Sequence, residues 1–181
     1  VIGTAYNLGY GVNKDSKKAF EWYFKAAEQG HADAQFLLGS MYDDGNGVLQ
    51  DKTKAFEWYS KSAEQNVAIA QWFVGRMYRN GEGVTENKIK AFEWLSKAAE
   101  QGYAGAQVDL GSMYSSGDGV LQDNTKAFEW FYKATEKNDA RAQFYVGLMY
   151  SQGKGVVQNK IKAFEWVSKA AEQGDADAQS Y

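Results

Sequence analysis

The chain has 181 residues, of which 44% are hydrophobic and 24% charged, so it has enough apolar side chains for a folded core. Its net charge of -3 offers no basic field for nucleic acid or for an anionic membrane. The chain contains no cysteine and no run of about 18 apolar residues, which argues against disulfides, thiolate metal sites and a membrane span. We therefore expect a soluble protein without metal or cofactor, either cytoplasmic or secreted or periplasmic without disulfides.

The five-residue segment Lys-Ala-Phe-Glu-Trp recurs through the whole chain. It occurs at 18–22, 54–58, 90–94, 126–130 and 162–166, each copy 36 residues after the previous one. A fixed period of this length is typical of repeat arrays, in which each unit buries its apolar face against the next. We therefore predict a single array over residues 1–181. It would contain a partial repeat at 1–30, full repeats at 31–66, 67–102, 103–138 and 139–174, and a partial repeat at 175–181.

The first half of each repeat predicts an amphipathic helix, here over 31–44. Apolar or small residues stand at 34, 37, 38, 41 and 42, the spacing of one helix face. Gly39 recurs in every copy although glycine costs about 1 kcal/mol inside a helix, which predicts a close approach by the neighbouring helix. The loop that follows has the pattern Gly-x-Gly-Val. Its first glycine, Gly45, is expected to end the helix in the left-handed conformation, with Val48 anchoring the loop.

The second half of each repeat predicts a second helix. It opens at Asp51, or at the equivalent Asp or Asn of the other copies, as an N-cap. It ends at a left-handed Gly or Asn, the residues at 30, 66, 102, 138 and 174. The expected buried stripe comprises Ala55, Trp58, Tyr59, Ser62 and Ala63, and the five periodic tryptophans are expected in the core or between repeats. Glu57 and Lys61, four residues apart, are expected to form an exposed ion pair.

These repeated residues resemble the Sel1-like repeat, a relative of the tetratricopeptide repeat. The resemblance rests on Ala34, Leu38-Gly39, Tyr42, Gly45-x-Gly47-Val48, Asp51, Lys54-Ala55, Trp58, Lys61 and Ala63, and it covers essentially the whole chain. It implies an all-α fold, a right-handed α/α superhelix (solenoid) of antiparallel helix pairs with a concave groove. Proteins of this family are mostly adaptors and scaffolds. One cysteine-rich bacterial branch has been linked to penicillin binding, and this chain, which lacks cysteine, departs from it.

Possible catalytic or ligand motifs are better explained by structure. The Gly-x-Gly loops follow a helix and occur five times, whereas a phosphate loop follows a strand. His31 is the only histidine and has no evident partner for acid–base chemistry, so we expect a surface residue. The pair Asp43-Asp44 could accept a cation, but other copies replace it, and solvated charge is the better interpretation. We therefore predict no catalytic, cofactor or metal residues.

The groove is expected to be lined by first-helix residues that differ between copies while the packing residues stay the same. By analogy with tetratricopeptide geometry, we predict partner contacts from Phe36, Ser40, Asp43, Ile69, Trp72, Arg76, Arg79, Val108, Ser112, Arg141, Phe144 and Leu148. Trp72 is the one tryptophan outside the periodic set, and an aromatic residue with Arg76 nearby is the usual composition of a binding hot spot. The alternative is that Phe36, Trp72 and Phe144 only fill space between helices.

These features favour a non-enzymatic scaffold or adaptor that binds a peptide or protein surface in its groove. One alternative is a carbohydrate- or peptidoglycan-binding protein, or a cell-wall-related hydrolase-like protein, because aromatic platforms also hold sugars. A second is a structural spacer within a longer repeat protein. Val1 and Tyr181 both fall inside a predicted first helix, so we expect either a longer natural chain or end-to-end self-association through uncapped repeats.

Overall fold

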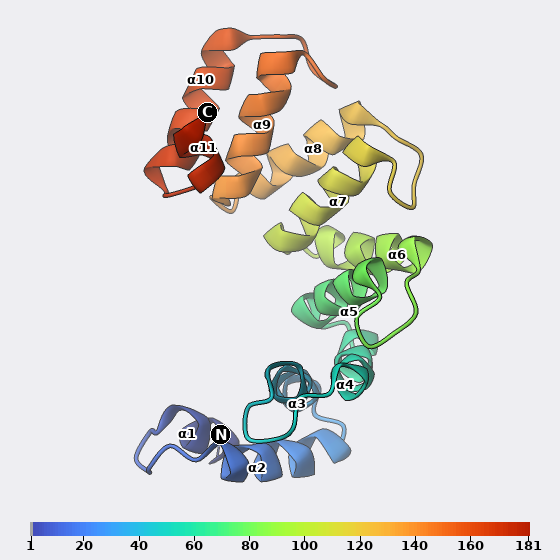
Figure 1. Cartoon of the computed structure of the whole chain (residues 1–181), viewed down its shortest axis with the longest axis vertical. Coiled ribbons are helices and arrows are strands. Elements are labelled where there is room, and N and C mark those ends of the chain that lie inside the picture. Colours follow the sequence, from blue (N-terminus) through green and yellow to red (C-terminus); the bar gives the residue numbers. More distant parts are fainter. Residues whose placement is uncertain (1) are drawn as a thin grey trace. The chain divides into compact units, whose positions relative to one another are not determined.

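The computed structural model describes residues 2–181, which form eleven helices and no strand (Figure 1). The helices that begin repeats are α1 (Ile2–Leu8), α3 (Ala32–Asp44), α5 (Ala68–Asn80), α7 (Ala104–Ser116), α9 (Ala140–Gln152) and α11 (Ala176–Ser180). The second helices are α2 (Ser16–Glu28), α4 (Lys52–Glu64), α6 (Lys88–Glu100), α8 (Asn124–Thr135) and α10 (Lys160–Glu172). The predicted all-helical fold with a 36-residue period is confirmed.

The helices group into two compact units, one ending at Ala91 and the other beginning at Phe92. In the first unit, α2 packs against α1 and α3, and α4 packs against α3 and α5. In the second unit, α8 packs against α7 and α9, and α10 packs against α9 and α11. Within each unit, these consecutive helices therefore pack against one another, as the units of a repeat array do. That the whole chain forms a single array stays a prediction.

Each second helix begins at the predicted cap. The Asp51 carboxylate accepts a hydrogen bond from the backbone N–H of Lys54 at 3.0 Å, which satisfies one of the free amides of the first turn. Asp15, Asn87, Asp123 and Asn159 accept the equivalent bond in the other repeats. Five caps at one repeat position therefore fix where the loop ends and the helix starts.

The predicted left-handed residues are also confirmed. Gly45 ends α3 with φ 70°, and its N–H donates to the carbonyl of Met41. The second helices are followed by Gly30, Gly102 and Gly174 or by Asn66 and Asn138, all with positive φ. Among the described residues, these two asparagines are the only non-glycine positions in that region. Asparagine tolerates this conformation better than other non-glycine residues, which explains the alternation between Gly and Asn.

Gly39 lies where the second helix of its own repeat comes closest. A Cβ there would stand 2.7 Å from Cδ1 of Tyr59, a ring that is 1% exposed. Gly111 meets Phe131 in the same way, and Gly147 meets Val167 and the backbone of Ala163. The predicted close approach is confirmed, and the residue that approaches is the one after the periodic tryptophan.

The tryptophan prediction named the core or the space between repeats, and only the first of these needs correction. Trp58 and its equivalents are not core residues: Trp22 is 41% exposed, and the other four are half-buried. Packing between repeats is found for two of them, since Trp58 lies 6.1 Å from Phe24 and Trp166 lies 5.9 Å from Tyr132, measured between ring centroids. The buried side chain is the next one along the helix, such as Tyr59 or Leu95.

The lysine that was expected to pair with Glu57 also has a different partner. The Lys61 ammonium stands over the Trp58 ring, 3.8 Å from its centroid, and all five repeats contain this contact. No ion pair joins Glu57 to Lys61 within the described chain. Trp58 and Lys61 are three positions apart on one helix face, so the Trp58 ring can take the cation in place of the Glu57 carboxylate.

Candidate functional site

Two hollows open between successive first helices at equivalent repeat positions. The α3–α5 hollow has a volume of 110 Å³ and is lined by Asp43, Phe73, Arg76, Met77, Asn80 and Glu82. The α7–α9 hollow has a volume of 340 Å³ and is lined by Ser112, Ser115, Phe131, Tyr145, Leu148, Met149, Gln152 and Lys154. Each of the six residues that line the α3–α5 hollow has its equivalent, two repeats later, in the lining of the α7–α9 hollow. The repeat geometry therefore forms the same hollow in each unit, while the side chains give it different chemistry.

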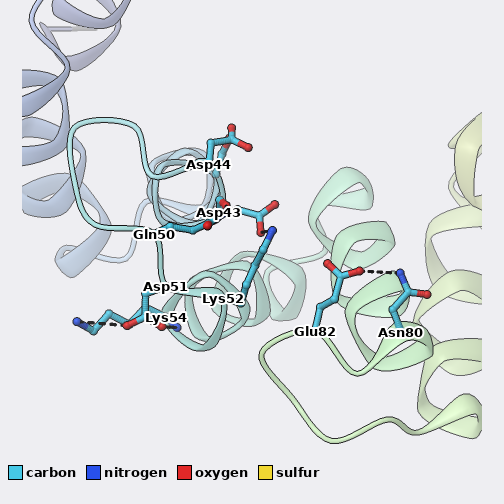
Figure 2. Close-up of polar contacts among 9 residues, drawn as sticks. Asp43, Asp44, Gln50, Asp51, Lys52, Lys54, Asn80 and Glu82 are labelled. Atoms are coloured by element: carbon cyan, nitrogen blue, oxygen red, sulfur yellow. Dashed lines mark hydrogen bonds and ion pairs between the residues drawn. The ribbon is translucent and has the colours of Figure 1, made fainter.

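Charged and amide groups surround the α3–α5 hollow. Lys52 of α4 donates a 2.6 Å hydrogen bond to the carboxylate of Asp43 on α3, and this bond raises the pKa of the Lys52 ammonium (Figure 2). On the α5 side, the Asn80 amide donates to Glu82 at 2.9 Å (Figure 2). The Asp43 side chain is 18% exposed and the Lys52 side chain 41%. The hollow therefore presents two carboxylates and the Arg76 guanidinium.

An aromatic cluster lies beside this hollow. Phe73 stacks on Tyr59 with ring centroids 4.8 Å apart, and burial raises the pKa of the Tyr59 hydroxyl, which stays protonated at neutral pH. Phe36 and Trp72 contact Phe73 at 5.8 Å and 4.9 Å, and the Arg76 guanidinium stands 4.9 Å from the Trp72 ring centroid. The structure therefore joins three of the predicted residues, Phe36, Trp72 and Arg76, through Phe73.

The α7–α9 hollow is less charged. Its floor is apolar, with Tyr145 stacked on the buried Phe131 at 4.7 Å and Met149 beside them. The Ser112 hydroxyl donates to the backbone carbonyl of Val108 at 3.0 Å. The Lys154 ammonium forms no ion pair with any described residue. A single cation therefore lies at the edge of an apolar hollow.

The other predicted contact residues fall into three groups. Val108 is 2% exposed and packs in the core of its unit, so its side chain is not offered to a partner. Ser40, Ile69, Arg79 and Phe144 are half-buried and lie outside both hollows. Arg141 is exposed, with its guanidinium 3.7 Å from Asp139.

His31 is exposed, as expected, and it precedes α3 without a side-chain cap.

Sequence reasoning missed the loop residue at the edge of each hollow. Glu82 and Lys154 occupy the middle position of Gly-x-Gly, a loop interpreted only as a helix stop. The available signal was variation, since that position holds Tyr10, Asn46, Glu82, Asp118 or Lys154 between unchanging glycines. Variation between repeats was the reason for choosing the first-helix residues, and the same reasoning would have selected this loop position.

The glutamine of each first helix was also missed, and its role is structural. Gln35, Gln71 and Gln107 are buried, and the side-chain amide of each donates at 3.2 Å to a carbonyl near the end of the preceding second helix. Each side-chain N–H₂ group therefore links one repeat to the next through a buried hydrogen bond, whereas Oε1 of Gln107 has no hydrogen-bond partner among the described residues.

Two kinds of feature are not found in residues 2–181. No cluster of three or more His, Cys, Asp or Glu side chains suited to a metal ion occurs in that range. None of its helices combines the length and apolar character needed to cross a membrane.

Comparison with known proteins identifies the repeat. A family model described as "Sel1 repeat" matches residues 2–31, 32–67, 68–103, 104–139 and 140–175. Its boundaries lie one residue after the predicted ones. A search of curated proteins gave no match.

Solved structures share the fold. The chain is 40% identical, with a TM-score of 0.94, to a protective antigen of uropathogenic Escherichia coli displaying an SLR fold, over 98% of this chain and 38% of that one. The chain thus spans well under half of that antigen's length. It is 37% identical, with a TM-score of 0.93, to a Sel1 repeat protein from Oxalobacter formigenes, over 98% of this chain and 70% of that one.

A more distant structure is the cysteine-rich protein B of Helicobacter pylori, with 31% identity and a TM-score of 0.58 over 72% of this chain and 94% of that one. The present chain has no cysteine, so no disulfide can contribute to its fold. Five matched repeats and two close structures nevertheless agree on the same unit. The chain belongs to the Sel1 repeat family.

Proposed function

We propose that this chain is a non-enzymatic interaction module that binds a peptide or a protein surface on its first helices. The observation that carries the proposal is that both units contain a hollow at the same repeat position but line it differently. Asp43, Arg76 and Glu82 line the first hollow where Ser115, Leu148 and Lys154 line the second. Packing constrains the floor of each hollow, whereas its rim is free to vary. Varied chemistry on a constant frame is what recognition of a specific partner requires.

The aromatic cluster provides the strongest anchor on this surface. Trp72 is half-buried, with Phe73 against its edge and Arg76 over its face, so both side chains are held in place before a partner arrives. Preorganised Trp and Arg side chains lose little entropy on binding and are enriched among hot-spot residues. A partner that covers the α3–α5 hollow would meet this pair at its edge.

The test is capture of partners from a lysate by the wild-type chain and by two double variants. We expect Trp72→Ala with Arg76→Ala to lose the specifically captured protein while the helical circular dichroism stays unchanged. The matched control is Trp58→Ala with Lys61→Ala, which removes the same kind of cation–aromatic pair from the second helix α4. We expect this control to retain capture.

Equal capture by all three chains would place the binding surface away from the first helices. Loss in both variants, with unchanged folding, would show that the second helices contribute equally. Either result would overturn the proposal as stated.

A further inference from the structure

The two hollows differ at three equivalent positions that decide their charge. Asp43, Arg76 and Glu82 in the α3–α5 hollow correspond to Ser115, Leu148 and Lys154 in the α7–α9 hollow. Two carboxylates and a guanidinium are thereby replaced by a hydroxyl, an aliphatic side chain and an ammonium. In the first hollow, Lys52 pairs with Asp43, and Arg76 and Glu82 carry opposite charges, whereas the second hollow has the unbalanced positive charge of Lys154, so the two suit different ligands.

Several polar groups of the α7–α9 hollow have no partner among the described residues. The side chains of Ser115, Gln152 and Tyr145 form no hydrogen bond to any described residue, and Lys154 forms no ion pair there. Ser115 does contribute its backbone carbonyl, which accepts a bond from Gln122 at 2.7 Å. Hydroxyl, amide and ammonium donors are therefore available around one opening.

The floor between these donors is apolar. Phe131 is 3% exposed and Met149 6%, and the half-buried Leu148 lies beside them. The volume of 340 Å³ falls at the lower end of the range of about 300–1,000 Å³ that is usual for ligand pockets. The α3–α5 hollow, at 110 Å³, falls below that range.

We infer that the α7–α9 hollow binds an apolar side chain of an acidic peptide segment, with the carboxylate of the adjacent peptide residue paired to Lys154. This inference rests on the proposed function and names the partner's chemistry at one site. The apolar side chain lies against Leu148 and Met149, and Ser115 and Gln152 are placed to donate to the peptide backbone. Charge-assisted pairing with Lys154 selects acidic over neutral or basic segments.

The experiment is an amide chemical-shift titration of the full chain with blocked peptides. The first probe contains one leucine next to one glutamate in a glycine–serine background, and its matched versions carry glutamine or lysine in place of glutamate. We expect shifts in α7, α9 and the Gly153–Gly155 loop, and a dissociation constant about tenfold lower for the glutamate peptide than for the glutamine peptide.

The matched variants exchange the residues of the two hollows. Lys154→Glu introduces the side chain that stands at the equivalent position in the first unit, so we expect the fold to be kept and the preference to reverse toward the lysine peptide. Glu82→Lys, in the α3–α5 hollow, should leave the shifts in α7 and α9 unchanged. Leu148→Ala should weaken all three peptides, because it removes the apolar contact without adding charge.

Equal affinity for the glutamate and glutamine peptides would overturn the inference, as would shifts confined to other helices or the absence of shifts in α7 and α9. None of these outcomes bears on capture of a partner through Trp72 and Arg76. Failure of this inference is therefore distinguishable from failure of the proposed function.

Discussion

At single positions, close contact between the two helices of a repeat leaves no space for a larger side chain. Gly39 faces the Tyr59 ring, and Phe73 stacks on the same ring. Gly39→Ala should destabilise the chain by about 1–2 kcal/mol, because overpacking at a site that cannot relax outweighs the gain in helix propensity. The free energy of unfolding in urea measures the effect, with Ser40→Ala as the neighbouring control. A stability equal to wild type would show that the ring moves freely.

The Asp43–Lys52 pair carries the pH dependence of the first hollow. The hydrogen bond from Lys52 raises its pKa, so the contribution to stability is present at neutral pH and is lost as pH rises through the raised value. Because Lys52 is partly exposed, the effect on stability should stay below about 1 kcal/mol.

Asp43→Asn should therefore lower the pKa of Lys52 without a large change in stability. The Cε chemical shift of Lys52, followed through an alkaline titration, measures this directly. The control is Asp44→Asn, since Asp44 is exposed and contributes less to the Lys52 pKa. An unchanged Lys52 pKa in Asp43→Asn would contradict the pair as the cause.

At the scale of elements, each second helix depends on the capping residue that precedes it. Asp51→Ala should cost about 1 kcal/mol of unfolding free energy, because the N–H of Lys54 loses its acceptor. Asp51→Asn should cost little, because Asn87 and Asn159 already perform this role in other repeats. Urea denaturation of the two variants compares them, and equal loss in both would mean that charge rather than the hydrogen bond stabilises the helix.

The elements were predictable from the sequence because their signals are local. A cap at Asp51 and a left-handed residue at Gly45 or Asn66 each follow from residue type and position. Equivalent residues stand at these positions in all five copies. The surroundings of Trp58 were not predictable in this way. Helical spacing places Trp58 near Glu57, Lys61 and the buried stripe at once, and only three-dimensional packing decides that Tyr59 is buried and that Lys61 stacks on the ring.

At the scale of the whole molecule, the candidate site was partly predictable. Asp43, Arg76, Ser112 and Leu148, chosen because they vary between repeats, line the hollows, and their contact with a partner stays a prediction. Val108 is the equivalent of Trp72 in the next repeat, yet it is buried, because its smaller side chain is enclosed by its neighbours. A continuous groove along all repeats and end-to-end self-association stay predictions, as does the alternative of a sugar ligand.

The central claim is that partners bind on the first helices. Hydrogen–deuterium exchange of the chain, with and without a captured partner, tests it most directly because it reports every helix in one measurement. We expect the partner to slow exchange in α3, α5, α7 or α9 and in the Gly-x-Gly loops beside the hollows. Slowed exchange confined to the second helices α4, α8 and α10, with the first helices unchanged, would contradict the claim.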